Sequence, residues 1–173
     1  MSCSIAVTMR RLFAPRHELS FSWWLWVRLL RSLRERGRGV HESGAFLLGK
    51  REASGSAHVH DFVLYDDLDA NSLSTGIVRF DGRYYGELWR LCGRRGLDVV
   101  ADVHTHPGGE WQSGSDREHP MIAQAGHVAL IVPNFARAPV SPRNVGMYRY
   151  LGNRTWQTIP NEARSSFLFL GPW

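Results

Sequence analysis

The chain has 173 residues, of which 43% are hydrophobic, 12% aromatic and 21% charged. This length and apolar content predict one compact domain with its own core, and they exclude a disordered or fibrous chain. The longest apolar run, residues 21–30, is interrupted by Arg28 and is about half as long as a bilayer-spanning helix. Because the start of the chain also shows no secretory signal pattern, we expect a cytoplasmic protein and no membrane span.

The charged residues are unusual in kind. The net charge is +5, and Lys50 is the only lysine, so almost every cation is an arginine. Arginine suits protein and nucleic-acid partners, but the sequence carries no zinc-finger, RNA-recognition or helix-turn-helix pattern, and we expect no nucleic-acid partner. The only cysteines are Cys3 and Cys92, which excludes a disulfide framework.

Hydrophobic spacing predicts two helices and six strands. In the first helix, Trp23, Trp24 and Trp26 cover more than one face, so we expect at least one of them to be exposed. The order of helix, strands, helix and strands predicts a mixed α/β sheet layered with helices. The predicted helices are 20–36 and 84–92, and the predicted strands are 46–48, 58–64, 76–80, 97–103, 128–132 and 145–150.

A metal-ligand pattern follows the strand predicted at 97–103. His104 and His106 are two residues apart, so in an extended chain both imidazoles point the same way and can reach one ion. Residues 107–109, Pro-Gly-Gly, allow the chain to turn back, so that Asp116 can supply a third ligand. Three protein ligands of these types, with one position left open, are typical of a catalytic zinc site.

Glu42 is the best candidate for a general base. It stands at the start of the apolar run 44–49, where its carboxylate would be partly desolvated. A carboxylate beside a metal ion can take a proton from the attacking water and deliver it to a leaving amine. The pattern therefore favours metal-dependent hydrolysis of an amide.

The order of these motifs resembles the JAMM family of zinc metalloproteases, also called JAB or MPN-plus. Glu42 opens the run ESGAFLLG, HTHP follows much later, and Ser-x-x-Asp and then GHVALIVPN come after it. The resemblance spans residues 12–156 and implies a single JAB/MPN-type domain with a curved, mostly antiparallel sheet flanked by helices. It leaves residues 1–11 as an extension or first strand and residues 157–173 as a C-terminal tail.

The resemblance also implies roles for single residues. The two histidines and the aspartate would hold one zinc ion, whose fourth ligand is water, and Glu42 would be the general base. Ser113 matches the serine that helps to hold the developing oxyanion. The six residues between His106 and Ser113 are one fewer than is usual in the family, which makes Ser115 the alternative.

The family removes ubiquitin and ubiquitin-like proteins from their conjugates, and short members resemble bacterial forms. The resemblance therefore implies a ubiquitin-like protein or its conjugate as substrate, and an operon, in some cases for antiviral defence, that also encodes ubiquitin-activating and ubiquitin-conjugating homologues. Two alternatives stay open. One is a hydrolase that acts on a sulfur-carrier protein of ubiquitin fold in biosynthesis, and the other is a catalytically silent scaffold.

Overall fold

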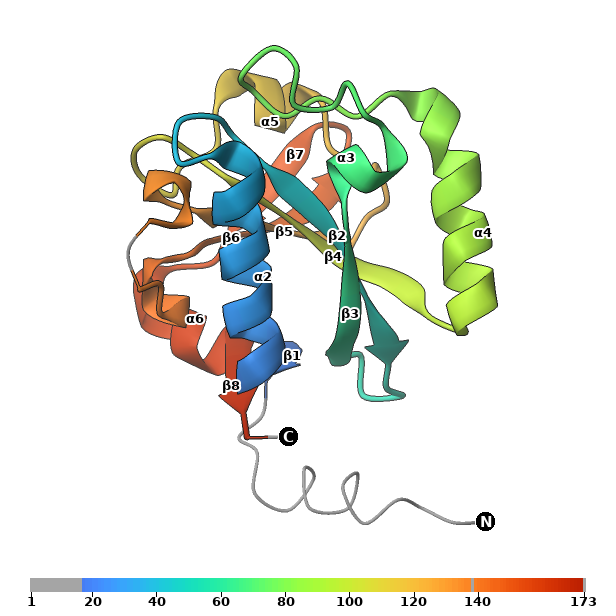
Figure 1. The fold of residues 1–173 in the computed structure, drawn as a ribbon. Coiled ribbons are helices and arrows are strands. Elements are labelled where there is room, and N and C mark those ends of the chain that lie inside the picture. The colour runs from blue at the N-terminus through green and yellow to red at the C-terminus, as the bar shows by residue number, and fades with distance from the viewer. Residues whose placement is uncertain (1–16, 138, 173) are drawn as a thin grey trace.

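The computed structural model describes residues 17–137 and 139–172, so the expectation for residues 1–11 lies outside the described part of the chain. Eight strands form one sheet in the order β7-β6-β5-β4-β2-β3-β1-β8 (Figure 1). The strands are β1 (Leu19–Ser22), β2 (Gly44–Arg51), β3 (Ala57–Leu64), β4 (Asp98–Thr105), β5 (Val128–Val132), β6 (Gly146–Gly152), β7 (Thr155–Thr158) and β8 (Leu168–Gly171). The helices are α2 (Trp23–Gly37), α3 (Tyr65–Leu68), α4 (Tyr85–Arg95), α5 (Gly114–Glu118) and α6 (Asn161–Phe167), with shorter helical turns at η1 (Gly82–Tyr84), η2 (Asn134–Ala136) and η3 (Pro142–Asn144).

The sheet is mixed and mostly antiparallel, as expected. Strand pairs β2/β3, β2/β4, β5/β6 and β6/β7 are antiparallel, whereas β4/β5, β1/β3 and β1/β8 are parallel. Figure 1 shows the curled sheet with α2 on one side and α4 on the other. The predicted fold class is therefore confirmed.

Strand β2 divides the core into two clusters. Because side chains alternate along a strand, Ala45 and Leu47 pack in the cluster that contains the buried residues of α2, whereas Phe46 and Leu48 pack with α4. All four side chains are fully buried. An unbroken apolar run such as this one is what a strand covered by helices on both faces requires.

Helix α2 begins at Trp23, within the segment 20–36 that the sequence predicts to be helical. Ser22 is its N-cap, and the Ser22 hydroxyl accepts a hydrogen bond from the backbone N–H of Leu25 at 3.2 Å. The residues before it form β1, because Phe21 is buried there and the backbone pairs with β3 and β8. Trp23 and Trp24 are 50% and 75% exposed, which confirms that this helix presents tryptophan to the surface.

The strand predicted at 76–80 is wrong. Gly76 has a φ of +84° and lies in a bend, and residues 78–80 belong to no strand or helix. The backbone N–H groups of this segment have other partners: Val78 donates to the Glu42 carboxylate at 3.1 Å, and Arg79 donates to the Ser72 carbonyl at 2.9 Å. Alternating apolar residues here reflect packing against the α4 cluster, not a sheet ladder.

The end of the chain returns to the sheet. Residues from 157 onward complete β7 and form α6 and β8, and β8 pairs with β1 in parallel. The remaining predicted elements are present with somewhat different ends, and β5 has the predicted bounds. Among the described residues, no helix is both long and apolar enough to cross a membrane.

Candidate metal centre

Strand β4 brings two imidazoles to one end of the sheet. His104 and His106 are 5% and 8% exposed, and their Nε2 atoms lie 3.0 Å apart. Thr105, between them, points to the opposite side, where its hydroxyl accepts a hydrogen bond from the Ser43 N–H at 3.0 Å. The alternation along the strand thus places both histidines on one face, as their spacing predicts.

Helix α5 positions Asp116 through a reciprocal cap. The Ser113 hydroxyl accepts a hydrogen bond from the Asp116 N–H at 3.1 Å, and Asp116 Oδ2 accepts one from the Ser113 N–H at 2.6 Å. These two bonds fix the turn that carries the carboxylate back over the histidines. The Ser-x-x-Asp spacing is therefore also the local reason why this short helix begins where it does.

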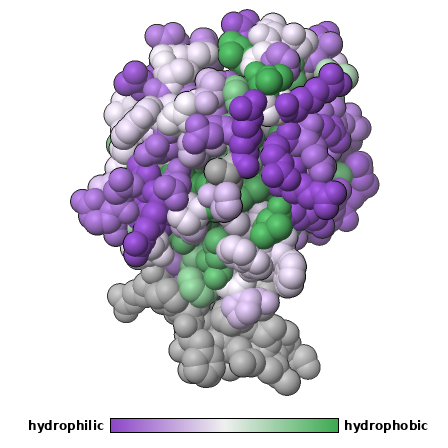
Figure 2. All heavy atoms as spheres, turned by 60° about the vertical axis from the view of Figure 1, so that its left-hand side comes forward, coloured by the Kyte–Doolittle hydropathy of each residue, from purple (hydrophilic) through white to green (hydrophobic). Residues whose placement is uncertain are grey.

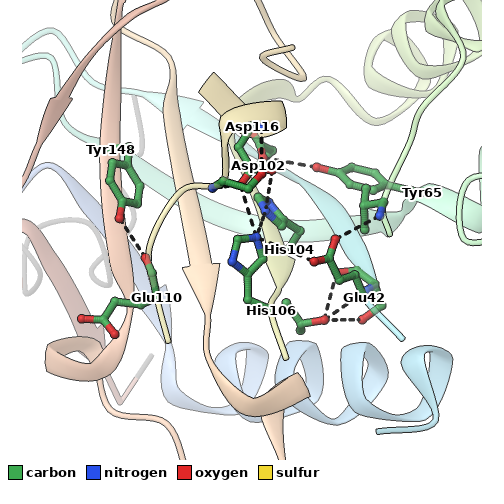
Figure 3. Close-up of polar contacts among 12 residues, drawn as sticks. Glu42, Tyr65, Asp102, His104, His106, Glu110, Asp116 and Tyr148 are labelled. Carbon is green, nitrogen blue, oxygen red and sulfur yellow. Dashed lines mark hydrogen bonds and ion pairs between the residues drawn. The ribbon is translucent and has the colours of Figure 1, made fainter. Parts of the chain in front are cut away.

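The three side chains converge on one point (Figure 3). Asp116 Oδ1 lies 3.4 Å from His104 Nε2, and Asp116 Oδ2 lies 3.3 Å from His106 Nε2. Donor atoms that are each about 2.0–2.1 Å from a tetrahedral ion lie about 3.3 Å from one another. Two imidazole nitrogens and a carboxylate at these separations therefore fit one metal ion and leave room for a ligand from outside the chain.

The electrostatics of the cluster favour a cation. Burial raises the pKa of the Asp116 carboxyl, but its contacts with His104 and His106 and the hydrogen bond from the Ser113 backbone outweigh this effect and hold the pKa well below its usual value. For His104, burial lowers the pKa, and the contact with Asp116 outweighs it, so the pKa lies above its usual value. Both shifts express the same preference for positive charge beside an ionised Asp116.

Glu42 lies beside the cluster and outside it. Its Oε1 atom is 3.9 Å from His106 Nε2, and its Oε2 atom accepts the hydrogen bond from the Val78 N–H at 3.1 Å. The Glu42 side chain is 14% exposed, and the backbone N–H of Glu42 donates to the Gly76 carbonyl at 3.0 Å. One carboxylate oxygen is therefore anchored while the other faces the histidines (Figure 3).

The two serines lie differently with respect to the cluster. Ser113 is exposed, and its hydroxyl oxygen is engaged by the Asp116 N–H while its own hydrogen stays available to donate. Ser115, two residues further on, lines a cavity of about 390 Å³ that also borders Asp116.

A buried polar network beneath the cluster was not predicted from the sequence. Asp102 lies on β4, two residues before His104 and on the same face. Its Oδ1 atom is 2.6 Å from His127 Nε2, and its Oδ2 atom accepts a hydrogen bond from the Tyr65 hydroxyl at 3.3 Å (Figure 3). Burial, with the charge of Asp102, raises the pKa of Tyr65 well above its usual value, so the phenol stays protonated and donates. The spacing of Asp102 from His104 places Asp102 on the face of the metal ligands, but it does not indicate Tyr65 and His127 as its partners.

The loop that follows His106 is held through Glu110. Its backbone carbonyl accepts a hydrogen bond from the Tyr148 hydroxyl at 2.8 Å (Figure 3), and its carboxylate pairs with Arg164 of α6 at 3.1 Å. Gly146 lets this loop come close, because a Cβ there would lie 2.0 Å from the Glu110 carbonyl oxygen. The C-terminal part of the chain therefore supports the loop between the histidines and the aspartate.

Comparison with known proteins gives two further findings. No protein-family model matches this chain. Over 70 residues, the chain is 35% identical to a protein named probable metalloprotease y4jG of Sinorhizobium fredii, and this segment spans 40% of the chain and 43% of that protein. The solution structure of protein DSY2949 from Desulfitobacterium hafniense matches with a TM-score of 0.63 at 14% identity, over 88% of this chain and 92% of that one.

The structural match shows a shared fold. The partial sequence match and the His104, His106 and Asp116 cluster concern the chemistry, and they agree: one points to a metalloprotease and the other to a metal-ion site. Both findings therefore concern a metal ion, one through the name of a partly matching protein and the other through the side chains of this chain.

Proposed function

We propose that this protein is a JAMM-type zinc isopeptidase or peptidase that cleaves a ubiquitin-like protein from its conjugates or its precursor. The observation that carries the proposal is the position of Glu42, whose free carboxylate oxygen stands 3.9 Å from a histidine of the ligand cluster without joining that cluster. A carboxylate placed there is suited to proton transfer, not to metal binding. The order of the motifs and the partial match to a probable metalloprotease support the same reaction class.

Zinc, when bound by His104, His106 and Asp116, supplies a Lewis acid that polarises a carbonyl group and lowers the pKa of a water molecule. Glu42 takes the proton of the attacking water on Oε1 and returns it to the nitrogen of the leaving amine. Because Oε2 is held by the Val78 N–H, the carboxylate keeps its direction through both transfers. The Ser113 hydroxyl, whose hydrogen is free, is the chain's donor for the carbonyl oxygen as negative charge develops on it.

The cavity beside Asp116 favours an extended substrate. The cavity has a volume of about 390 Å³. Its apolar wall is formed by Val78, Phe80, Tyr85 and Met121, and polar residues line the rest. The segment 78–80 borders this cavity without belonging to a strand, so a peptide can lie against its apolar side chains. The narrow, glycine-rich tail of a ubiquitin-like protein fits such a surface.

The biological setting follows from this substrate class. We place the protein in the bacterial cytoplasm, with ubiquitin-activating and ubiquitin-conjugating homologues encoded in the same, antiviral, operon. The presence or absence of such genes beside the coding sequence tests this part of the proposal.

Glu42→Gln tests the mechanism. The amide keeps the shape of the carboxylate but cannot take a proton, so we expect kcat on a ubiquitin-like protein with a fluorogenic C-terminal amide to fall by about two to four powers of ten. Zinc per chain, measured by atomic emission, should stay unchanged. Glu52→Gln, the same change in an exposed turn, is the matched control and should keep full activity.

Three results would contradict the proposal. Near-normal turnover by Glu42→Gln would remove Glu42 from the mechanism. A zinc-loaded wild-type protein that cleaves no ubiquitin-like amide but releases a peptide fused to a sulfur-carrier protein would reassign the substrate, and inertness toward both would indicate a scaffold.

A further inference from the structure

An apolar groove lies on the side of the molecule away from the α4 face. It runs between α2 and residues 136–137 and 139–141 and has a volume of about 480 Å³. Trp26 lines its buried side and is fixed by a hydrogen bond from Nε1 to the Val140 carbonyl at 3.1 Å. Trp23 and Val27, at its edge, are 50% and 41% exposed. Figure 2 shows apolar side chains gathered on this side of the molecule with hydrophilic ones around them.

The groove carries charge of one sign. Its charged lining residues, among those the structure describes, are all arginines: Arg31, Arg34 and Arg137. Arg34 makes no ion pair within residues 17–137 and 139–172, and Arg137 donates to the Gly39 carbonyl instead of a carboxylate. Arg31 forms an ion pair with Glu35 at 2.8 Å. Because both side chains are exposed, this pair offsets the charge of Arg31 only weakly.

The other side of α2 is different. Arg28 pairs with Asp61 at 2.7 Å, and Arg36 pairs with Asp66 and Asp67 of α3. Arginines that face β3 and α3 are therefore paired with carboxylates of the chain itself, whereas Arg34 and Arg137 at the groove have no such partner among the described residues. The uncompensated charge indicates that an occupant of the groove brings carboxylates.

The chain does not supply such an occupant from its own start. Residues 1–16 contain Arg10, Arg11 and Arg16 and no aspartate or glutamate. A second copy of the same face would place arginines against arginines. Charge complementarity thus favours a different protein, with an apolar side chain for the groove and acidic residues beside it.

The groove is also connected to the metal ligands. Its wall at Ala136 continues directly from a turn in which Asn134, Phe135 and Ala136 have φ values of 52°, 51° and 55°, a left-handed conformation that is unfavourable for residues other than glycine. This turn holds the backbone of His106: Phe135 N–H donates to the His106 carbonyl at 2.9 Å, and Asn134 N–H donates to the Gly108 carbonyl at 3.0 Å. An occupant that packs on the wall restrains the turn, and the turn restrains His106.

We propose that this groove docks an acidic segment with an apolar anchor from a partner protein, and that docking and metal binding strengthen each other through the turn at 134–136. The docking part is independent of the proposed function. The regulatory part rests on it, because it requires that His106 binds the metal.

The test uses a phage-displayed library of random dodecapeptides, selected on the full-length zinc-loaded protein and depleted on Val27→Asp. We expect the surviving peptides to share an aromatic residue or leucine flanked by aspartate and glutamate. A synthetic copy of the most enriched peptide should bind the wild type and lose about tenfold in affinity with Arg34→Glu. Arg90→Glu, the same reversal at an exposed position of α4, is the matched control and should bind as the wild type does.

Several results would overturn docking of an acidic segment. These are selected peptides without carboxylates, no selected peptides at all, or equal losses in Arg34→Glu and Arg90→Glu. Sedimentation of the protein with vesicles of phosphatidylcholine and phosphatidylglycerol, abolished by Val27→Asp, would assign the groove to a membrane instead. A concentration-dependent dimer, abolished by the same variant, would assign it to a second copy.

Reciprocity tests the regulatory part. If the turn couples the two sites, the peptide should bind the zinc-loaded protein about fivefold or more tightly than the chelator-treated protein, and zinc should bind more tightly in its presence by the same factor. Equal peptide affinity with and without zinc would overturn the coupling and leave docking intact. If the wild-type protein binds no zinc in the absence of the peptide, the metal site itself is contradicted.

Discussion

Gly44 allows close packing beside the candidate site because it has no side chain. A Cβ at this position would lie 2.2 Å from the Tyr65 ring and 2.9 Å from the backbone carbonyl oxygen of Val103. The absence of a side chain lets the Tyr65 ring cross the start of β2 and reach Asp102, which lies on the same strand as His104. Steric constraints therefore explain why position 44, two residues after Glu42, is a glycine.

Gly44→Ala should lower the free energy of unfolding by about 1–3 kcal/mol, because the added methyl group overpacks a site bounded partly by backbone. Denaturant unfolding followed by fluorescence measures the change. Gly93→Ala in α4, where a Cβ would meet nothing within 4 Å, is the control and should raise stability by about 0.5–1 kcal/mol through better helix propensity. Equal effects of the two changes would contradict the steric account.

Sequence spacing predicts which candidate site residues come together. It does not predict which residues surround them. His104, His106 and Asp116 converge because period-two alternation and a helix cap are local rules, readable over a few residues. The contacts of Asp102 with Tyr65 and His127 join residues 37 and 25 positions apart, and no local pattern encodes them.

Helix α6 supports the loop that joins the histidines to Asp116. Arg164 is 3% exposed, and its guanidinium contacts the Glu110 carboxylate and the Arg143 carbonyl, both at 3.1 Å. Arg164→Met should lower the free energy of unfolding by about 3 kcal/mol, because it leaves the Glu110 carboxylate without its partner. The Arg164→Met/Glu110→Gln double variant should lose less than the sum of the single variants, and strict additivity in denaturant unfolding would show that the pair does not interact.

Two segments, 76–80 and 168–171, show why strands are harder to predict from the sequence. The apolar alternation at 76–80 is typical of a strand, but Glu42 and Ser72 take up backbone N–H groups that a neighbouring strand would need. Conversely, residues 168–171 are too short a run to be read as a strand by themselves, and they become one because β1 lies beside them. The two longest helices, α2 and α4, are predicted from local spacing, whereas α3, α5 and α6 are not, and strand pairing depends on remote residues.

For the molecule as a whole, the sheet joins the beginning and end of the described chain. Parallel pairing of β1 with β8 places Leu19 beside Leu168. Parallel pairing of β4 with β5 sets the strand that carries His104 next to the strand that leads to the groove. The candidate ligands come from β4 and α5, which only the folded chain holds together. The folded state should therefore bind the metal far more tightly than the unfolded chain, and binding should stabilise the fold.

Zinc at about 100 times its dissociation constant should raise the free energy of unfolding by about 2.7 kcal/mol, and excess chelator should reverse the gain. For a chain of this length that corresponds to a rise in Tm of about 5–10 °C, measured by differential scanning calorimetry at several zinc concentrations. Asp116→Asn keeps a side chain that can cap α5 but removes the anionic ligand, so its Tm should not respond to zinc. Asp98→Asn, an exposed carboxylate at the start of β4, should respond as the wild type does. A rise in Tm of the same size in Asp116→Asn would mean that the stabilising ion binds at some other place on the molecule, and the cluster at the end of β4 would then lose its claim to be the metal centre.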